Sequence, residues 1–203
     1  MPNAGSLPKS KAMTPQRPLA VLLDRDGVIN LDSPDYILTP EQWIPVPGSL
    51  HAIARLHKAG IAIAIVSNQS GLGRGMMDQN TFNAIHAKMM LAIEDAGGFI
   101  SHVSYCPHAP DEGCLCRKPK PGMVGDSLKA CDVAADAAIM IGDSVRDMQA
   151  AHSAGVAGIL VQSGYGDAAS ILQQSRQCMP AVIAFADLAG AVDHMLGEAS
   201  SCC

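Results

Sequence analysis

The chain has 203 residues, a hydrophobic fraction of 48% and a formal net charge of −5. This composition excludes an extended disordered chain and favours a compact globular protein of one ordinary domain. The acidic balance, without a long basic run, disfavours nucleic acid as a partner, and no apolar stretch reaches the roughly 18 residues of a membrane span.

The first residues are rich in Pro, Ser and Lys and lack the apolar core of a signal peptide. We therefore expect a disordered tail at 1–17, a single domain at 18–198 and a frayed end at 199–203. Met13 is an alternative start of the native protein. A cytoplasmic, reducing compartment is expected, in which the seven cysteines need not form disulfides.

Apolar runs and helical periodicity predict alternating strands and helices along the domain. The first strand is expected at 20–23, and a loop with four prolines at 31–47 is interpreted as a short flap. The alternation specifies a doubly wound, three-layer α/β/α fold of the Rossmann type with a mostly parallel sheet. No sizeable insertion is present for a large cap domain. The remaining elements are expected, in chain order, as a helix at 48–60, a strand at 61–66, a helix at 79–95, a strand at 99–105, a helix at 122–130, a strand at 138–141, a helix ending near 155, strands at 158–161 and 181–185, and a closing helix at 188–196.

Two aspartates, Asp24 and Asp26, stand at the end of the first strand and are followed by Gly27. Ligands of open α/β sheets gather beyond the carboxyl ends of the strands. Two carboxylates at a dry strand end repel each other, and a hard cation such as Mg²⁺ relieves that repulsion. An Asp-rich turn with a glycine at positive φ is the structural alternative.

Two further strands also end in polar residues. Ser67 and Asn68 follow the second strand, and Asp143 and Asp147 follow the fourth. In a doubly wound sheet these ends converge on one rim, so residues far apart in the chain form one site. The carboxylates can hold Mg²⁺, whereas the hydroxyl and the amide suit phosphate oxygens.

A cation for a phosphate group is offered by the RKPKPG segment, which contains Arg117 and Lys118 just ahead of a predicted helix. The alternative for Lys118, judged from that residue alone, is an ordinary exposed loop lysine.

The chain resembles the haloacid dehalogenase-type phosphatases over residues 19 to about 165. Their four motifs are matched, in the same order, by LDRDG, SNQ, RKPKPG and IGDSVRD. The resemblance implies that Asp24 is a nucleophile that forms an aspartyl-phosphate and that Asp26 is the general acid and base. It also implies that Ser67 and Lys118 bind the transferring phosphoryl group.

The resemblance further implies a catalytic Mg²⁺ held by Asp24, by the backbone carbonyl of Asp26 and by Asp143. Asp147 is then expected outside the first set of ligands, where it orients Lys118 or a metal-bound water.

Four potential zinc ligands fall within the segment CPHAPDEGCLC at 106–116. Three thiolates and one imidazole match a closed tetrahedral Zn²⁺ site, which leaves no open position for catalysis. The alternative is a chance grouping of reduced cysteines. Because the last ligand directly precedes the two cationic residues of RKPKPG, a structural zinc would position them. The expected ligands are Cys106, His108, Cys114 and Cys116.

The zinc loop beside DRDGVIN and NQSG resembles the capless branch that contains the histidinol-phosphate phosphatases and the heptose bisphosphate 7-phosphatases. NQSGLGRG, RKPKPGM and EQWIPVPGSLHAIARL favour the heptose enzymes. These remove the C7 phosphate of D-glycero-D-manno-heptose 1,7-bisphosphate in the synthesis of nucleotide-activated heptose (ADP-heptose) for the lipopolysaccharide core. Arg74 and Arg117 suit the second phosphate, whereas Ser144 stands where some of these enzymes carry a lysine. The expected substrate contacts are Asp32, Ser33, Asp35, Asn68, Gln69, Ser70, Arg74, Arg117 and Ser144.

Two alternatives remain open. One is a histidinol-phosphate phosphatase of histidine biosynthesis, and the other is a catalytically inactive, zinc-bearing interaction module. The expected partner is a small sugar bisphosphate, without nucleic acid or membrane, and the absence of a cap favours a monomer. The anomer of the sugar is left open.

Overall fold

The computed structural model of the protein describes residues 17–197. Apart from residue 17, the tail expected at 1–17 lies outside these residues. The alternative start at Met13, residue 198 and the end expected at 199–203 also lie outside them.

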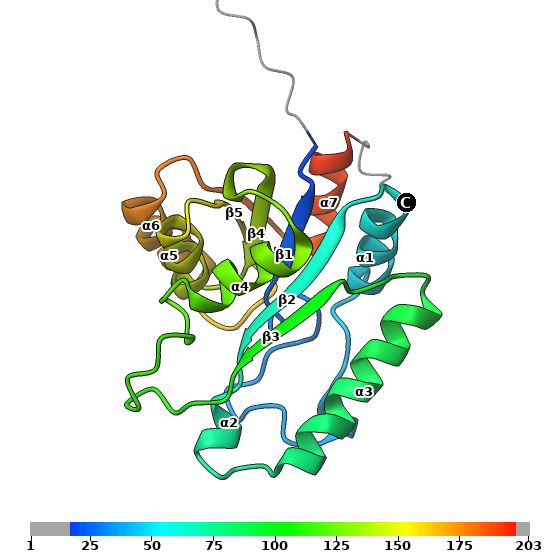
Figure 1. Cartoon of the computed structure of the whole chain (residues 1–203), viewed down its shortest axis with the longest axis vertical. Coiled ribbons are helices and arrows are strands. Elements are labelled where there is room, and N and C mark those ends of the chain that lie inside the picture. Colours follow the sequence, from blue (N-terminus) through cyan, green and yellow to red (C-terminus); the bar gives the residue numbers. More distant parts are fainter. Residues whose placement is uncertain (1–16, 198–203) are drawn as a thin grey trace, which may run out of the picture.

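Within residues 17–197, six parallel strands form one sheet in the order β3-β2-β1-β4-β5-β6 (Figure 1). The chain runs outward from β1 to β2 and β3, then returns to the other side of β1 as β4. The topological switch point, where ligands bind in such sheets, therefore lies between β1 and β4. The strands are β1 Ala20–Leu23, β2 Ala62–Asn68, β3 His102–Cys106, β4 Ala138–Gly142, β5 Ala157–Val161 and β6 Ile183–Phe185.

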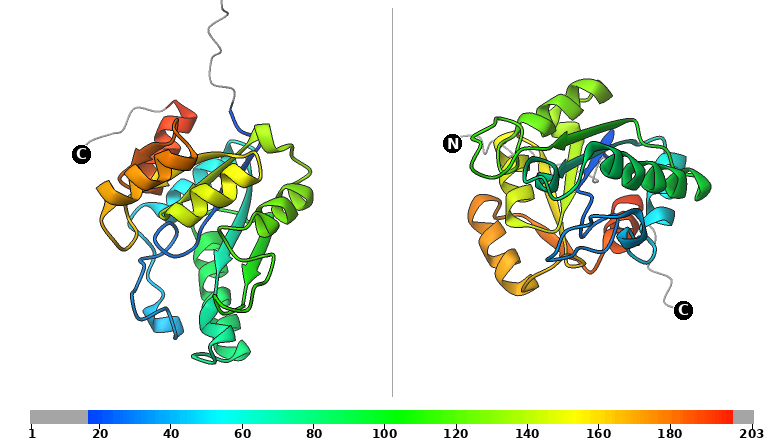
Figure 2. Two further views of the ribbon diagram at one scale, coloured as in Figure 1. Left: turned by 90° about the vertical axis from the view of Figure 1, so that its left-hand side faces the viewer. Right: turned by 90° about the horizontal axis from the view of Figure 1, so that it is seen from below.

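Helices cover both faces of the sheet, so the expected three-layer α/β/α architecture is confirmed (Figure 2). Helices α1, α3 and α7 pack on one face, and α4, α5 and α6 on the other. Short 3₁₀ turns lie at Pro40–Gln42 and Ala135–Ala137. The helices are α1 Ser49–Lys58, α2 Ser70–Gly73, α3 Gln79–Asp95, α4 Gly122–Cys131, α5 Val145–Ser153, α6 Ala168–Cys178 and α7 Leu188–Leu196.

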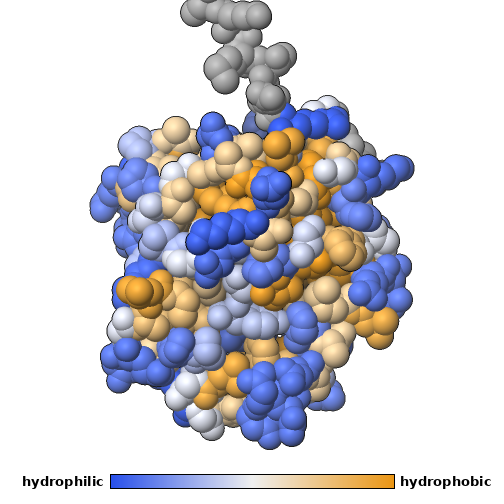
Figure 3. Space-filling view, in the orientation of Figure 1, coloured by the Kyte–Doolittle hydropathy of each residue, from blue (hydrophilic) through white to orange (hydrophobic). Residues whose placement is uncertain are grey.

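The central strand β1 is buried on both sides, as its continuous apolar sequence requires. Val21 and Leu23 belong to the core under α1, α3 and α7, whereas Ala20 and Leu22 belong to the core under α4 and α5. On the face of the molecule seen in Figure 3, hydrophilic and hydrophobic side chains are interspersed. No helix within the described residues is long and apolar enough to cross a bilayer.

The predicted element boundaries were good where the sequence marks the ends of a helix. Helices α3 and α7 have the expected bounds, and Asp78 caps α3 by accepting a hydrogen bond from the backbone of Thr81. Helix α6 was missed; Ser175 is its one fully buried residue, and its apolar residues Ile171 and Leu172 are only partly buried. Strand β6 begins at Ile183 instead of residue 181, since it pairs with β5 over three residues at the sheet edge.

The segment at 31–47 forms a packed flap beyond the end of β1. Trp43 is buried, and its indole nitrogen donates a hydrogen bond to the Asn30 side chain at 3.0 Å. Backbone bonds join Leu31 to Ile44 and Val46 to Ile29, which fasten both ends of the flap to the body. The flap is thus held in place at the carboxyl edge of the sheet.

Candidate active site

The carboxyl ends of β1, β2 and β4 meet at one rim, as the sequence predicted. Asp24 directly follows β1 and its backbone nitrogen bonds to Ile141 of β4. Gly27 has φ +78°, and a Cβ there would lie 2.5 Å from Asp143 Oδ2, so only glycine lets the turn approach Asp143. Both the left-handed backbone and the close contact therefore require Gly27.

The carboxylate of Asp26 is held by three neighbouring side chains. The side chain of Asp26 accepts hydrogen bonds from Arg25 at 2.8 and 3.0 Å, from Asn30 at 2.9 Å and from Gln69 at 2.9 Å. Burial opposes the charge of Asp26, but the Arg25 guanidinium and these donors hold its pKa below the usual value. Asp26 is therefore an ionised carboxylate in this arrangement.

Lys118 reaches the end of β1 from the loop after β3. Its ammonium nitrogen lies 2.9 Å from Asp24 Oδ2 and 2.6 Å from Asp147 Oδ1, and it donates to the Val66 carbonyl at 2.7 Å. The backbone of Lys118 exchanges two hydrogen bonds with the Asn68 side chain, at 3.0 and 3.1 Å. Lys118 is 2% exposed, which excludes the exposed loop lysine.

Three carboxylates, those of Asp24, Asp143 and Asp147, offer oxygens within 4.8 Å of one another. Burial and the neighbouring carboxylates raise the pKa of Asp24 to about 7, against the opposing effect of Lys118. Burial, then Asp147 and Asp24, raise the pKa of Asp143 to about 9. Burial disfavours the charge of Lys118, but Asp147 and Asp24 outweigh it and raise its pKa, so its ammonium stays charged.

This cluster fits a divalent cation of the Mg²⁺ type. When ionised, the three carboxylates carry more negative charge than one ammonium offsets, and burial together with this excess charge raises the pKa values of Asp24 and Asp143. All the donors are hard oxygens. The cluster contains Asp147 beside Asp24 and Asp143, whereas the Asp26 side chain is turned to Arg25. Both oxygens of Asp147 already have partners, since one contacts Lys118 and the other accepts from the Ser144 backbone and hydroxyl.

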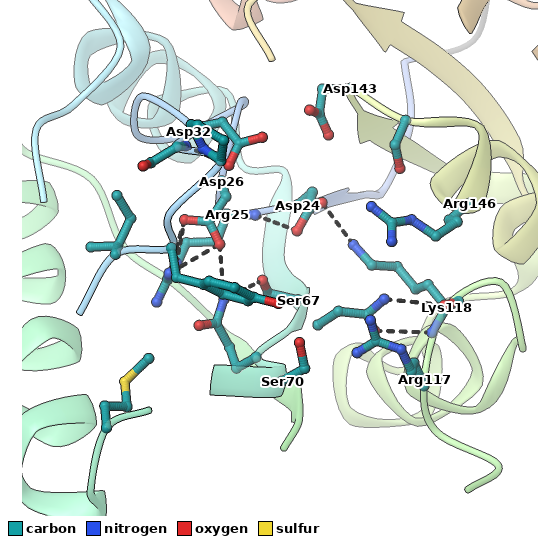
Figure 4. A pocket seen from close by; sticks show the side chains of 18 residues that line it. Asp24, Arg25, Asp26, Asp32, Ser67, Ser70, Arg117, Lys118, Asp143 and Arg146 are labelled. Atoms are coloured by element: carbon teal, nitrogen blue, oxygen red, sulfur yellow. Dashed lines mark hydrogen bonds and ion pairs between the residues drawn. The ribbon is translucent and has the colours of Figure 1, made fainter. Parts of the chain in front are cut away.

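A cavity of about 220 Å³ is lined by Asp24, Lys118 and Asp143 (Figure 4). Ser67 lies at its base, where its hydroxyl accepts a hydrogen bond from Gln69 at 2.9 Å. Asp35 and Arg74 are not among the lining residues; Arg74 lies in a separate surface depression beside the zinc loop. Of the expected substrate contacts, seven line the cavity: Asp32, Ser33, Asn68, Gln69, Ser70, Arg117 and Ser144.

Three further polar residues in the lining were not singled out from the sequence: Arg25, Tyr36 and Arg146. Arg25 is 2% exposed, and a charged residue between two aspartates at a buried strand end requires a partner nearby. Tyr36 has φ +65°, which no sequence pattern indicated. Arg146 stands in the first turn of α5, where a basic residue opposes the helix dipole, and that placement was a usable signal.

The four expected zinc ligands come together in the loop after β3. The sulfur of Cys106 lies 3.6 Å from His108 Nδ1 and 3.6 Å from the sulfur of Cys114, and Cys116 sulfur lies 3.2 Å from His108 Nδ1. Tetrahedral zinc with bonds of about 2.0–2.3 Å separates its ligand atoms by roughly 3.5–3.8 Å, so the donor set fits Zn²⁺.

The zinc loop is also fastened to the end of β2. The Gln69 backbone donates to the Cys106 carbonyl at 2.7 Å, and Gly73 of α2 donates to the Pro107 carbonyl at 2.9 Å. Arg117 donates to the His108 carbonyl at 3.4 Å. The loop therefore contacts both cavity-lining segments, the one after β2 and the one that carries Arg117.

A sequence profile of the HAD-hydrolase-like family matches residues 115–190. The D-glycero-beta-D-manno-heptose-1,7-bisphosphate 7-phosphatase of Bordetella bronchiseptica is 50% identical over 146 residues, 72% of this chain and 82% of that protein. The Pseudomonas putida protein of the same name is 46% identical over 147 residues, 72% of this chain and 84% of its own.

A solved structure has the same architecture. The crystal structure of D,D-heptose 1,7-bisphosphate phosphatase from B. bronchiseptica, complexed with magnesium and phosphate, superimposes with a TM-score of 0.82. The two sequences are 44% identical, and the match covers 89% of this chain and 99% of that one. The chain belongs to the haloacid dehalogenase-like hydrolases and, within them, to the family of the D-glycero-beta-D-manno-heptose-1,7-bisphosphate 7-phosphatases.

Proposed function

We propose that this protein is a Mg²⁺-dependent phosphatase that removes the C7 phosphate from D-glycero-β-D-manno-heptose 1,7-bisphosphate. One observation carries the proposal: the buried ammonium of Lys118 contacts Asp24 within a cluster of three carboxylates, at the rim where phosphate ligands bind in this fold. The relatives named for this reaction, one of them solved with magnesium and phosphate, support the same substrate and the β anomer.

Asp24 is proposed as the nucleophile. It stands at the floor of the cavity, and its contact with Lys118 keeps a carboxylate oxygen oriented for in-line attack on phosphorus. Attack gives an aspartyl-phosphate, while the sugar oxygen leaves as the alcohol. Ser67 and Lys118 bind the phosphoryl oxygens, whose charge is stabilised mainly by donors already in place.

Asp26 is proposed as the group that moves protons. It protonates the leaving oxygen in the first half-reaction and removes a proton from the hydrolytic water in the second. The ionised state set by Arg25 suits the second role directly. For the first role, the negative charge of the bound phosphate raises the proton affinity of Asp26.

Asp24, Asp143 and the Asp26 carbonyl are proposed to hold Mg²⁺, with Asp147 positioning Lys118. When bound, Mg²⁺ offsets the repulsion between the anionic nucleophile and the anionic phosphate ester. Cys106, His108, Cys114 and Cys116 are proposed to hold a structural Zn²⁺, since four protein ligands complete its tetrahedron. Because these thiolates must stay reduced, we place the enzyme in a reducing compartment, the cytoplasm. We further propose that it is a monomer with one catalytic domain at 18–198.

The test compares phosphate release from the heptose 1,7-bisphosphate and from histidinol phosphate with one preparation of the protein. We expect a clear preference for the bisphosphate, and the Asp24→Asn variant should lose activity on both substrates. A preference for histidinol phosphate would replace the proposed substrate. A wild-type protein inert toward both would support the inactive interaction module instead.

A further inference from the structure

The active-site cavity adjoins a second depression, called here the basic groove. The groove has a volume of about 320 Å³ and shares Arg117, Lys118 and Arg146 with the cavity. Lys120 also lines it, and none of its described lining residues is acidic. A ligand whose one end lies at Lys118 can therefore extend into a region of positive charge.

Most of the cations around the cavity and the groove are already engaged. Arg25 pairs with Asp26, and Lys118 pairs with Asp24 and Asp147. Lys120 donates to the carbonyls of Gly113 and Cys114, at 3.0 and 2.5 Å, and so fastens the zinc loop. These side chains have little capacity left for a second anion.

Arg146 and Arg117 differ from these. Arg117 makes a single hydrogen bond, 3.4 Å long, to a backbone carbonyl. Arg146 is exposed, and its side chain makes no hydrogen bond or ion pair with the residues between 17 and 197, although its charge acts on the carboxylate of Asp32 across the cavity. Figure 4 shows its side chain directed from α5 toward the centre of the cavity.

The position of Arg146 in α5 is also unfavourable in the absence of an anion. It stands between the N-cap Ser144 and Asp147, in the first helical turn, where the helix dipole repels a cation. A bound phosphate offsets that repulsion, because a guanidinium can donate two parallel hydrogen bonds to phosphate oxygens.

We propose that Arg146 is a specificity-determining residue that, together with Arg117, binds the phosphate of the substrate that is not cleaved. The proposal rests on the proposed function, because it requires a substrate with two phosphates. The reacting phosphate then lies at Asp24, Ser67 and Lys118, and the second lies between the two arginines at the entrance to the basic groove. Binding energy from the second phosphate holds the first one in register with the nucleophile.

The test measures kcat/KM for two substrates that share the reacting group: the heptose 1,7-bisphosphate and the heptose 7-phosphate, which lacks the phosphate on C1. The variants are Arg146→Gln, which removes the charge, and Arg146→Lys, which keeps the charge but cannot donate two parallel hydrogen bonds. Arg176→Gln, on the exposed face of α6, is the matched control for the loss of one positive charge. Glutamine is a good helix former, so α5 is retained.

The readout is the preference ratio, kcat/KM for the bisphosphate divided by kcat/KM for the 7-phosphate. We expect Arg146→Gln to lower this ratio by about 10- to 100-fold, the value of a hydrogen-bonded charge contact, and Arg146→Lys to lower it less. Arg176→Gln should keep the wild-type ratio.

Three results would overturn the proposal. An equal loss on both substrates would mean that Arg146 acts on the reacting phosphate or on the nearby carboxylate of Asp32. An unchanged ratio in Arg146→Gln, with a wild type that prefers the bisphosphate, would refute the role of Arg146 but keep the function. A wild type without preference for the bisphosphate would refute the function and the subsite together.

Discussion

The ammonium nitrogen of Lys118 lies 2.9 Å from Asp24 Oδ2 and connects the loop after β3 to the end of β1. The same nitrogen contacts Asp147 of α5, so one side chain joins three segments that are distant in the chain. Asp24, Lys118 and the acidic cluster are thus held in one fixed arrangement before substrate binds.

Replacing Lys118 by methionine tests this arrangement. The variant keeps the apolar stem but leaves the carboxylates of Asp24 and Asp147 without their cation. We expect a loss of about 3 kcal/mol in the free energy of unfolding, measured by urea denaturation, because a buried charge loses its partner. Turnover should fall by about 100- to 1000-fold, because a preorganised donor to the phosphoryl group is removed.

Lys129→Met on the exposed side of α4 is the control, and its free energy of unfolding should change by about 0.5 kcal/mol or less. A Lys118→Met protein with wild-type turnover would contradict the role given to Lys118.

Gly27 and Gly60 offer a matched pair of alanine substitutions. Both have left-handed backbones, with φ +78° and +75°, but a Cβ at Gly60 meets no atom within 4 Å. Gly60→Ala should cost about 1–2 kcal/mol for the backbone alone. Gly27→Ala should cost more, because its Cβ lies against Asp143, and it should weaken Mg²⁺ binding measured by calorimetry. Equal stability and equal Mg²⁺ affinity in the two variants would contradict the close packing at Gly27.

Much of this arrangement was predictable from the sequence, for physical reasons. Parallel strands of a doubly wound sheet end at one rim, so polar residues after β1, β2 and β4 had to meet. The capping residue Asp78 and the glycine at Gly97 located the ends of α3, whereas α6 was missed, since Ser175 is its one fully buried residue.

The roles of individual cavity residues were less predictable. Asp35 and Arg74 belong to segments whose other residues line the cavity, but neither of the two lines it. A position in a motif does not determine the direction of a side chain on a flap or after a short helix. Arg25 and Arg146 were missed, since their place in the cavity lining depends on distances between strand ends and loops that periodicity does not report, although the position of Arg146 in the first turn of α5 was a signal.

The affinity for Mg²⁺ should depend on pH. In the metal-free protein the pKa of Asp24 is raised to about 7 and that of Asp143 to about 9, so Mg²⁺ must displace protons from both below these values. We expect calorimetry to give at least about tenfold tighter Mg²⁺ binding at pH 8 than at pH 6, with proton release.

The stability of the metal-free protein should follow the opposite course. The pKa values of Asp24 and Asp143 are raised from 3.8 in the unfolded chain to about 7 and about 9 in the folded protein. Their protonated forms therefore stabilise the fold fully below pH 3.8, and this contribution is lost as the pH rises through about 7 and about 9. Added Mg²⁺ should therefore raise the unfolding temperature more at pH 8 than at pH 6. A pH-independent Mg²⁺ affinity would contradict the carboxylate cluster as the metal site.

The zinc site can be tested with two cysteine variants. Cys116→Ser removes a proposed ligand, whereas Cys131→Ser alters a half-buried cysteine of α4 outside the cluster. We expect metal analysis to find about one zinc per chain in the wild type and in Cys131→Ser, and much less in Cys116→Ser. Loss of zinc should lower the unfolding temperature and the activity, since the loop supports Arg117 and the end of β2. Equal zinc content in the two variants would show that this cluster is not the site.

The proposed reaction is tested most directly by phosphorus NMR, which follows the two phosphates of the heptose 1,7-bisphosphate during turnover with Mg²⁺. We expect the C7 phosphate signal to disappear and inorganic phosphate to appear, while the C1 phosphate signal persists in the product. Release of the C1 phosphate, or no turnover by a protein that retains both metals, would contradict the proposed reaction.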